Sequence, residues 1–354
     1  MRFLLLLAWF ADFPDLRWAP ADLAVPAMTE DEPAAGKRVR QTLPEWRGTG
    51  VHHALYLPRD WRPGRSYPVL VEYAGNGNYR NKYGDVSLGT VAGSNLGYGI
   101  SGGEGFLWVS MPFVDAPAKT NALTWWGDVD ATIDYCRKAV RMVCEQYGGD
   151  PSAVILTGFS RGAIACNYIG LHNDAIADLW LAFIPYSHYD GVRGWPYEGS
   201  DRASALARLN RLKGRASFLT HESSVEAVRS YLAEIGVKAP FTIRPVPFRN
   251  HNDAWTLRDT PLRRELRGWV REVLKTKPGT HAISGRVRDQ AGRPLKGIRV
   301  ESGFTHFTTT DEAGRYRLAG LIDSVRAVSA GGTPRQVILD GHDAPGINFT
   351  LPRE

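Results

Sequence analysis

The chain has 354 residues, which exceeds the usual size of one hydrophobic core, so we expect two domains. Hydrophobic residues make up 43% and charged residues 23%, as in ordinary globular proteins. The net charge is +6, but Lys and Arg are scattered and form no stripe interleaved with aromatic residues, which argues against nucleic-acid binding.

The first residues resemble a secretory signal. Met1 and Arg2 precede an apolar run over residues 3–10, and small-residue sites follow at residues 19–21 and 25–27. We therefore expect residues 1–27 to be a signal peptide and lead-in, and the protein to be secreted or periplasmic. Residues 11–45 are rich in Pro, Ala and charge and are expected to be extended or poorly ordered. No later run approaches 18 apolar residues, so no membrane span is expected.

The segment over residues 45–275 alternates apolar strands with helices. This alternation predicts an α/β fold, with a doubly wound, mostly parallel sheet covered by helices on both faces. The predicted strands cover residues 51–58, 67–73, 106–113, 154–157, 179–185, 216–221 and 241–247, and the predicted helices cover residues 129–147 and 262–274, a stretch after residue 160 and another that ends at residue 232.

The pattern changes after a linker at residues 276–280. Short strands are predicted over residues 283–288, 298–301, 304–310 and 316–318, with turns at Gly292 and Gly314 between them. Short strands separated by turns are typical of a small all-β sandwich, which we expect over residues 281–354.

A Gly-x-Ser-x-Gly motif, Gly158-Phe159-Ser160-Arg161-Gly162, lies between a predicted strand and a predicted helix. In this context the serine sits on a sharp turn, with its hydroxyl exposed above the sheet. The pattern predicts Ser160 as a nucleophile.

A serine nucleophile needs a base and an orienting acid, in the chain order Ser, acid, His for this topology. His251 follows the last sheet strand and precedes the terminal helix, so it is the predicted base. The favoured acid is Glu222, at the end of the strand over residues 216–221, and the second candidate is Asp190, after the preceding strand. Glu226 is close, but Ser223-x-x-Glu226 indicates a capping box.

Two backbone N–H groups are expected to form the oxyanion hole. One belongs to Arg161, directly after the nucleophile, and the other to Asn76, in the Gly75-Asn76 turn after the second strand. Several aromatic residues fall in loops near strand ends, which favours a ring-bearing substrate. The predicted substrate-binding residues are Trp125, Trp126, Tyr189 and Trp195.

The three cysteines do not predict a metal or disulfide site. Cys136 and Cys144 are expected on one helix, where eight residues span roughly 12 Å, beyond disulfide reach. None of the three, Cys166 included, has metal-ligand spacing, so we expect small buried side chains.

Residues 45–275 resemble the α/β-hydrolases, and are similar to secreted esterases related to polyhydroxybutyrate depolymerases and feruloyl esterases. The resemblance rests on residues 158–162, on the Gly75-Asn76 turn and on Asn250-His251-Asn252-Asp253-Ala254-Trp255. It implies acyl transfer to water by a serine, a histidine and a carboxylate, without metal or cofactor. Two stretches depart from the family pattern: Ala74-Gly75 replaces the usual His-Gly, and Glu222-Ser223-Ser224 replaces a longer Gly-x-x-Asp loop.

Residues 281–354 resemble the carboxypeptidase regulatory-like, transthyretin-like β-sandwich. The resemblance rests on residues 284–287, 292–295 and 308–316. It implies a fold, but no particular role.

The expected function is a serine esterase acting on a small-molecule or polysaccharide-linked carboxylic ester, such as a carbohydrate-linked or aryl ester. Two alternatives remain open at this point. One is a serine peptidase on the same fold, and the other is a non-catalytic binding protein on a degenerate hydrolase scaffold, which the unusual acid loop favours.

Overall fold

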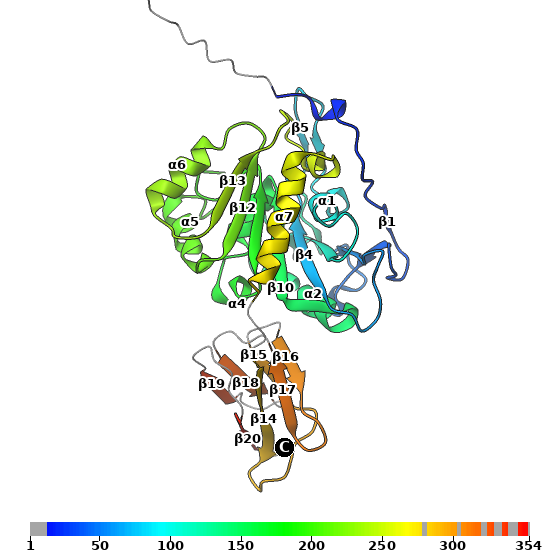
Figure 1. Cartoon of the computed structure of the whole chain (residues 1–354), viewed down its shortest axis with the longest axis vertical. Coiled ribbons are helices and arrows are strands. Elements are labelled where there is room, and N and C mark those ends of the chain that lie inside the picture. The colour runs from blue at the N-terminus through cyan, green and yellow to red at the C-terminus, as the bar shows by residue number, and fades with distance from the viewer. Residues whose placement is uncertain are drawn as a thin grey trace, which may run out of the picture.

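A computed structural model describes residues 13–277, 282–302, 306–319, 324–328, 335–338 and 346–352 (Figure 1). The predicted apolar signal run therefore lies outside the described residues, as do residues 278–280 of the predicted linker and residues 304–305 of a predicted strand. None of the described helices combines the length and the apolar character needed to span a bilayer.

The central sheet has the strand order of an α/β-hydrolase. Its order in the described chain is β1-β2-β3-β7-β4-β10-β11-β12-β13. Strand β3 is antiparallel to both of its neighbours, and the other pairs are parallel. The predicted fold class is thus confirmed. The strands are β1 (Met28–Thr29), β2 (Arg38–Gln41), β3 (His53–Tyr56), β4 (Tyr67–Tyr73), β7 (Leu107–Met111), β10 (Gly149–Phe159), β11 (Ala182–Tyr186), β12 (Ala216–His221) and β13 (Phe241–Pro245).

Helices cover both faces of this sheet, and α7 crosses one of them (Figure 1). The alternation of side chains along β4 shows the two faces: Val69 and Val71 belong to one buried cluster and Leu70 to the other. Ile133 and Val140 of α2 pack in the first cluster, and Leu266 of α7 packs in the second. The α-helices are α1 (Leu96–Ser101), α2 (Val129–Tyr147), α3 (Arg161–Tyr168), α4 (Asp174–Ala177), α5 (Arg202–Leu209), α6 (Glu226–Ile235) and α7 (Pro261–Lys275).

Two small hairpins and several 3-10 turns were not predicted. The first hairpin follows β4 and the second follows β7, so both lie at the carboxyl edge of the parallel strands, where α/β sheets place their ligand sites. The hairpin strands are β5 (Tyr79–Arg80) with β6 (Val86–Ser87), and β8 (Val114–Asp115) with β9 (Thr120–Asn121); the 3-10 turns are η1 (Leu16–Trp18), η2 (Pro44–Trp46), η3 (Val91–Gly93), η4 (Asn210–Leu212) and η5 (Asp253–Leu257).

The structure of the amino-terminal segment differs from the predicted extended or poorly ordered lead-in. Residues 13–45 do not form a loose lead-in, because Asp15 and Leu16 are buried and β1 and β2 extend the main sheet. The guanidinium of Arg263 in α7 forms an ion pair with Asp22 at 2.6 Å. A composition rich in Pro, Ala and charge gave no indication of these contacts with distant parts of the chain.

The carboxyl-terminal residues form two small sheets, of order β17-β14-β20 and β16-β15-β18-β19 in the described chain. Consecutive strands β14 and β15 lie in different sheets, and Ile283, Val287, Val300 and Leu318 form a shared core. This is the predicted β-sandwich. Its strands are β14 (Ala282–Asp289), β15 (Arg299–Ser302), β16 (His306–Thr309), β17 (Arg315–Ala319), β18 (Ser324–Val328), β19 (Arg335–Ile338) and β20 (Phe349–Leu351).

Candidate active site

Ser160 occupies a strained turn between β10 and α3. Its φ is 54° and its ψ is −110°, in a region that residues other than glycine rarely adopt. Close packing explains the flanking glycines: a Cβ atom on Gly162 would overlap the carbonyl oxygen of Tyr73, and one on Gly158 would overlap the carbonyl of Gly162. Such backbone strain costs about 1–3 kcal/mol and is concentrated at functional sites.

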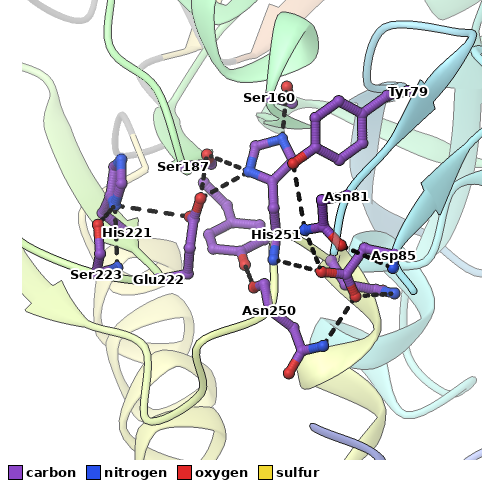
Figure 2. A network of polar contacts seen from close by, with 12 residues as sticks. Tyr79, Asn81, Asp85, Ser160, Ser187, His221, Glu222, Ser223, Asn250 and His251 are labelled. Carbon is purple, nitrogen blue, oxygen red and sulfur yellow. Dashed lines mark hydrogen bonds and ion pairs between the residues drawn. The ribbon is translucent and has the colours of Figure 1, made fainter. Parts of the chain in front are cut away.

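His251 lies between Ser160 and Glu222 (Figure 2). Its Nε2 atom is 3.0 Å from Ser160 Oγ, and its Nδ1 atom is 2.7 Å from Glu222 Oε1. Ser160 follows β10, Glu222 follows β12 and His251 comes after β13, so the carboxyl ends of parallel strands bring the three together. All three residues were predicted from the sequence.

The charge of Glu222 determines which ring nitrogen of His251 carries the proton. Burial raises the pKa of Glu222, but the hydrogen bond and charge of His251 outweigh it and lower the pKa to about 2. Glu222 is therefore a carboxylate at neutral pH and accepts the Nδ1–H of His251. This leaves Nε2 of His251 as the acceptor for the hydroxyl of Ser160.

The two other acid candidates have different partners. Both oxygens of Asp190 bind the guanidinium of Arg208, at 2.8 and 3.1 Å. Glu226 is exposed and pairs with Arg229. The predicted capping box is wrong, because Val225 is the N-cap of α6 without a side-chain hydrogen bond.

Ser187, which was not predicted, adds a fourth polar group at the end of β11 (Figure 2). Its Oγ atom lies 3.0 Å from Nδ1 of His251 and donates to Oε1 of Glu222 at 3.3 Å. Its φ of 90° is again in the region that favours glycine. Its position after a buried strand, at the same sheet edge as Ser160 and Glu222, is the signal that could have identified it.

The first hairpin holds the loop that carries His251 (Figure 2). The carboxylate of buried Asp85 accepts the backbone N–H of His251 at 3.0 Å and the side-chain amide of Asn250 at 2.9 Å. Asn81 donates to the same carboxylate at 2.7 Å. The ring of Tyr79 lies 4.8 Å from the ring of His251, between centroids.

The amino-terminal segment holds the same loop from another side. The backbone N–H of Leu16 donates to Oδ1 of Asn250 at 2.6 Å, and Arg249 pairs with Asp15 at 3.1 Å. Hydrogen bonds to Arg17 are the largest effect on Asp15 and hold its pKa well below the usual range.

The loops around the predicted oxyanion hole meet at Arg161. The side chain of this residue is fully buried, and its guanidinium donates to the carbonyl oxygens of Gly89 (3.2 Å), Ala122 (3.3 Å) and Trp125 (2.7 Å). Burial lowers its pKa to about 9. The side chain of Asn76 accepts the backbone N–H of Trp125 at 2.8 Å. The sequence analysis considered only the backbone of Arg161 and missed this side-chain role.

The four predicted substrate-binding rings separate into two groups. Trp126 and Tyr189 are only 4% and 2% exposed and pack in the core, so a substrate cannot reach their faces. Their prediction as substrate contacts is corrected accordingly. Trp125 and Trp195 are half-buried, with ring centroids 5.6 Å apart. The ring of His188 lies between Trp195 and the proposed triad, with its centroid 5.1 Å from that of Trp195 and 5.4 Å from that of His251.

Within the described ranges, no group of three or more His, Cys, Asp or Glu residues could hold a metal ion. All three cysteines are free. Burial raises the pKa of Cys136 and Cys144 to about 12, and raises the pKa of Cys166 as well.

Comparisons with known proteins identify the carboxyl-terminal domain. Residues 282–352 match the family model of the carboxypeptidase regulatory-like domain. No curated protein sequence is significantly similar to the chain. Among the solved structures that are similar to the chain are esterases and an isopeptidase, and less than a fifth of their residues are identical to this chain.

Three solved structures illustrate these similarities. A thermostable esterase is 19% identical with a TM-score of 0.40, over 66% of this chain and 62% of its own. The feruloyl esterase module from Clostridium thermocellum is 16% identical with a TM-score of 0.39, over 67% of this chain and 92% of its own. AtxE2 isopeptidase is 16% identical with a TM-score of 0.43, over 68% of this chain and 40% of its own. The chain thus spans less than two thirds of the first and third.

Proposed function

We propose that the chain is a serine hydrolase that cleaves carboxylic esters. Ser160 is the nucleophile, His251 the general base and acid, and Glu222 the orienting carboxylate. The observation that carries the proposal is the continuous set of contacts Ser160–His251–Glu222, at 3.0 and 2.7 Å, on a strained turn. A nucleophile bonded to a base, which is bonded in turn to an orienting group, is the arrangement that covalent hydrolysis requires.

The reaction has two halves. Ser160 Oγ attacks the ester carbonyl while its proton passes to Nε2 of His251, and the same proton then goes to the departing alcohol as the C–O bond breaks. The acyl group remains on Ser160. Water attacks it, His251 takes the proton of the water and returns it to Ser160 Oγ, and the carboxylic acid leaves. Glu222 stabilises the imidazolium that forms in each half.

The backbone N–H groups of Arg161 and Asn76 are the proposed donors to the oxyanion. The tight packing of α3 against β4, at Gly162 and Tyr73, supports this assignment because it brings the loop after β4 to the start of α3. The side chains of Arg161 and Asn76 both hold the Trp125 backbone, which rigidifies this region. Removing one such donor typically costs about 10²–10³ in rate.

The half-buried rings of Trp125 and Trp195 favour a substrate that contains an aryl or sugar ring. The substrate proposal is therefore an aryl or carbohydrate-linked ester, either as a small molecule or attached to a polysaccharide.

Export is part of the same proposal and is supported by the apolar run after Met1 and Arg2. The candidate cleavage sites at residues 19–21 and 25–27 follow Asp15 and Leu16, so cleavage there would remove both contacts to the His251 loop. Cell fractionation with amino-terminal sequencing tests export and locates the cleavage. Activity confined to the cytoplasmic fraction would contradict export.

The test is hydrolysis of 4-nitrophenyl acetate and butyrate by the wild type, Ser160→Ala and Ser152→Ala. Ser152 lies in strand β10, eight residues before Ser160, and is the matched control. We expect Ser160→Ala to lose at least about 10⁴-fold in kcat and Ser152→Ala to retain wild-type activity. Equal rates for Ser160→Ala and the wild type would refute the proposal.

The same panel separates the alternatives. Faster cleavage of matched peptide 4-nitroanilides than of esters would favour a peptidase. A folded wild type that cleaves neither class would favour a binding protein.

A further inference from the structure

A pocket of about 300 Å³ lies beside the proposed site. It is formed by the loop after β11 and by the segment from the end of β12 into α6. A cavity of about 150 Å³ already holds a benzene ring, so this pocket has room for a substrate group. Ser187, which contacts His251, is one of its lining residues, and the pocket therefore adjoins the reacting groups.

The walls of the pocket combine apolar and hydrogen-bonding groups. Val192, Trp195 and Val228 contribute apolar surface. His188 and His221 also line it. Burial is the largest effect on both imidazoles: it lowers the pKa of His188 to about 3 and the pKa of His221 below its usual range. Both are therefore neutral at physiological pH, and neither supplies a positive charge.

Arg193 supplies the charge of this pocket. Its guanidinium lies 3.6 Å from the ring centroid of Trp195, and both residues line the pocket. Among the described residues, no carboxylate lies within 4.0 Å of Arg193, and no Asp or Glu lines the pocket. The adjacent carboxylate, Glu222, is bonded to His251. The pocket therefore offers apolar walls, imidazole N–H groups and one uncompensated cation.

We infer that this pocket binds a carboxylate carried by the ester substrate, with Arg193 as its ionic partner; the inference rests on the proposed esterase function. The apolar walls hold the carbon skeleton between the carboxylate and the ester, and His188 and His221 provide neutral donors. The substrate class is thus an ester that bears a free carboxylate, on either its acyl part or its alcohol part.

Paired substrates test the inference on each side of the ester. Mono-4-nitrophenyl adipate and 4-nitrophenyl hexanoate differ by a carboxylate at the end of the same acyl chain. The hexanoyl esters of 4-hydroxybenzoate and 4-hydroxybenzamide differ by a carboxylate on the alcohol. We expect Arg193→Gln to lower the ratio of kcat/KM for anionic over neutral substrate at least about fivefold in one pair, mainly through KM.

Two further variants make the result specific. Arg193→Lys keeps the charge but loses the planar stacking on Trp195, and should retain part of the preference. Arg62→Gln removes the same charge from the exposed turn before β4, at the opposite edge of the sheet, and should leave both ratios unchanged. An unchanged ratio in Arg193→Gln, or an equal fall in Arg62→Gln, would overturn the inference.

A binding measurement makes the result independent of catalysis. Titration of monomethyl adipate into Ser160→Ala by calorimetry should give saturable binding that Arg193→Gln weakens at least about fivefold. Equal binding by the two variants, or better binding of methyl hexanoate than of monomethyl adipate, would contradict carboxylate recognition. Loss of ester hydrolysis with intact adipate binding would refute only the proposed function.

Discussion

Nδ1 of His251 and Oε1 of Glu222 lie 2.7 Å apart, although 29 residues separate them in the chain. Both side chains are about nine-tenths buried, so this contact is shielded from solvent. The unusual loop Glu222-Ser223-Ser224 therefore brings a carboxylate to the histidine ring without the longer Gly-x-x-Asp loop of the resembled family.

Glu222→Gln should abolish most of the activity. The substitution keeps the shape of the side chain but removes its charge, so His251 loses its fixed tautomer and the stabilisation of its imidazolium. We expect kcat to fall by about 10³–10⁴ with little change in KM. Steady-state kinetics on 4-nitrophenyl butyrate measure the effect.

Asp190→Asn is the matched control for this prediction. It leaves the buried Arg208 without its ion-pair partner, which should lower the free energy of unfolding by about 3–5 kcal/mol. The activity of each folded molecule should not change. Wild-type activity in Glu222→Gln together with an inactive, folded Asp190→Asn would identify Asp190 as the acid.

Arg161→Lys should lower kcat roughly 10- to 100-fold, because a lysine ammonium cannot reach three separate carbonyl groups and the loops would shift. Arg215→Lys is the control, since half-buried Arg215 also donates to backbone carbonyls, including that of Trp180, but precedes β12 at the other edge of the sheet. It should lower stability and leave kcat unchanged. Equal kcat in Arg161→Lys and the wild type would contradict the role of this side chain.

Deletion of residues 1–18 should lower both stability and kcat, because it removes the contacts of Asp15 and Leu16 with the His251 loop. Loss of these bonds should cost about 2 kcal/mol in the free energy of unfolding. Deletion of residues 1–12 keeps both contacts and is the control. Urea denaturation and steady-state kinetics measure the free energy of unfolding and kcat of the two truncated proteins. Equal values of both quantities in the two proteins would contradict the prediction.

A buried pair of carboxyl groups should make stability depend on pH. The backbone N–H of Asn95 lies 3.1 Å from Glu72 Oε1 and 3.2 Å from Asp253 Oδ2. Burial raises the pKa of both groups, to about 7 for Glu72 and about 6 for Asp253. In the unfolded chain both carboxyls have ordinary pKa values of about 4. Between about pH 4 and pH 7 this pair therefore binds more protons in the folded protein than in the unfolded chain, and its contribution to the free energy of unfolding falls as pH rises.

Asp253→Asn tests this pH dependence. The variant removes one of the two acids, so between pH 5 and pH 7.5 its free energy of unfolding should change more in favour of the folded state than that of the wild type does. His53 and His188, whose pKa values burial lowers to about 3, act in the opposite direction within this window, but they do so in both proteins and cancel in the comparison. Glu222, whose pKa is lowered, also acts in the opposite direction, but below about pH 4.5. Urea denaturation at the two pH values gives the slopes, and a steeper loss in the variant would contradict the prediction.

Much of the main domain could be predicted because its elements have local signals. Strand Tyr67–Tyr73 is apolar apart from Glu72, and strand Ala216–His221 has Phe218 and Leu219 at its centre. Helix Val129–Tyr147 begins after the N-cap Asp128 and ends before Gly148. Their observed bounds coincide with the predicted ones. The segment over residues 13–45 was missed because its composition gives no local signal: β2 is held by pairing with β3, and Asp15 and Leu16 are held by contacts with residues more than 230 positions away.

Three residues of the candidate site were predictable from the sequence. Ser160, Glu222 and His251 follow strands in the order that the topology requires, and the structure brings them within hydrogen-bonding distance. Ser187 also follows a strand at this edge but belongs to no motif, and Asp85 lies in a hairpin that was not predicted; they contact His251 from 64 and 166 positions away.

The aromatic residues show a different limit. Trp125 and Trp126 are neighbours in one loop, yet Trp126 packs flat against Tyr168 while Trp125 stays half-buried beside Trp195. Loop position alone does not distinguish a ring that faces a substrate from one that completes the core.

The most direct test is mass spectrometry of the folded protein after reaction with a fluorophosphonate, which forms a stable bond only with an activated serine. We predict one adduct per chain, on the peptide that contains Ser160, and its loss in His251→Ala. An unlabelled wild type, or an adduct on another serine, would contradict Ser160 as the nucleophile.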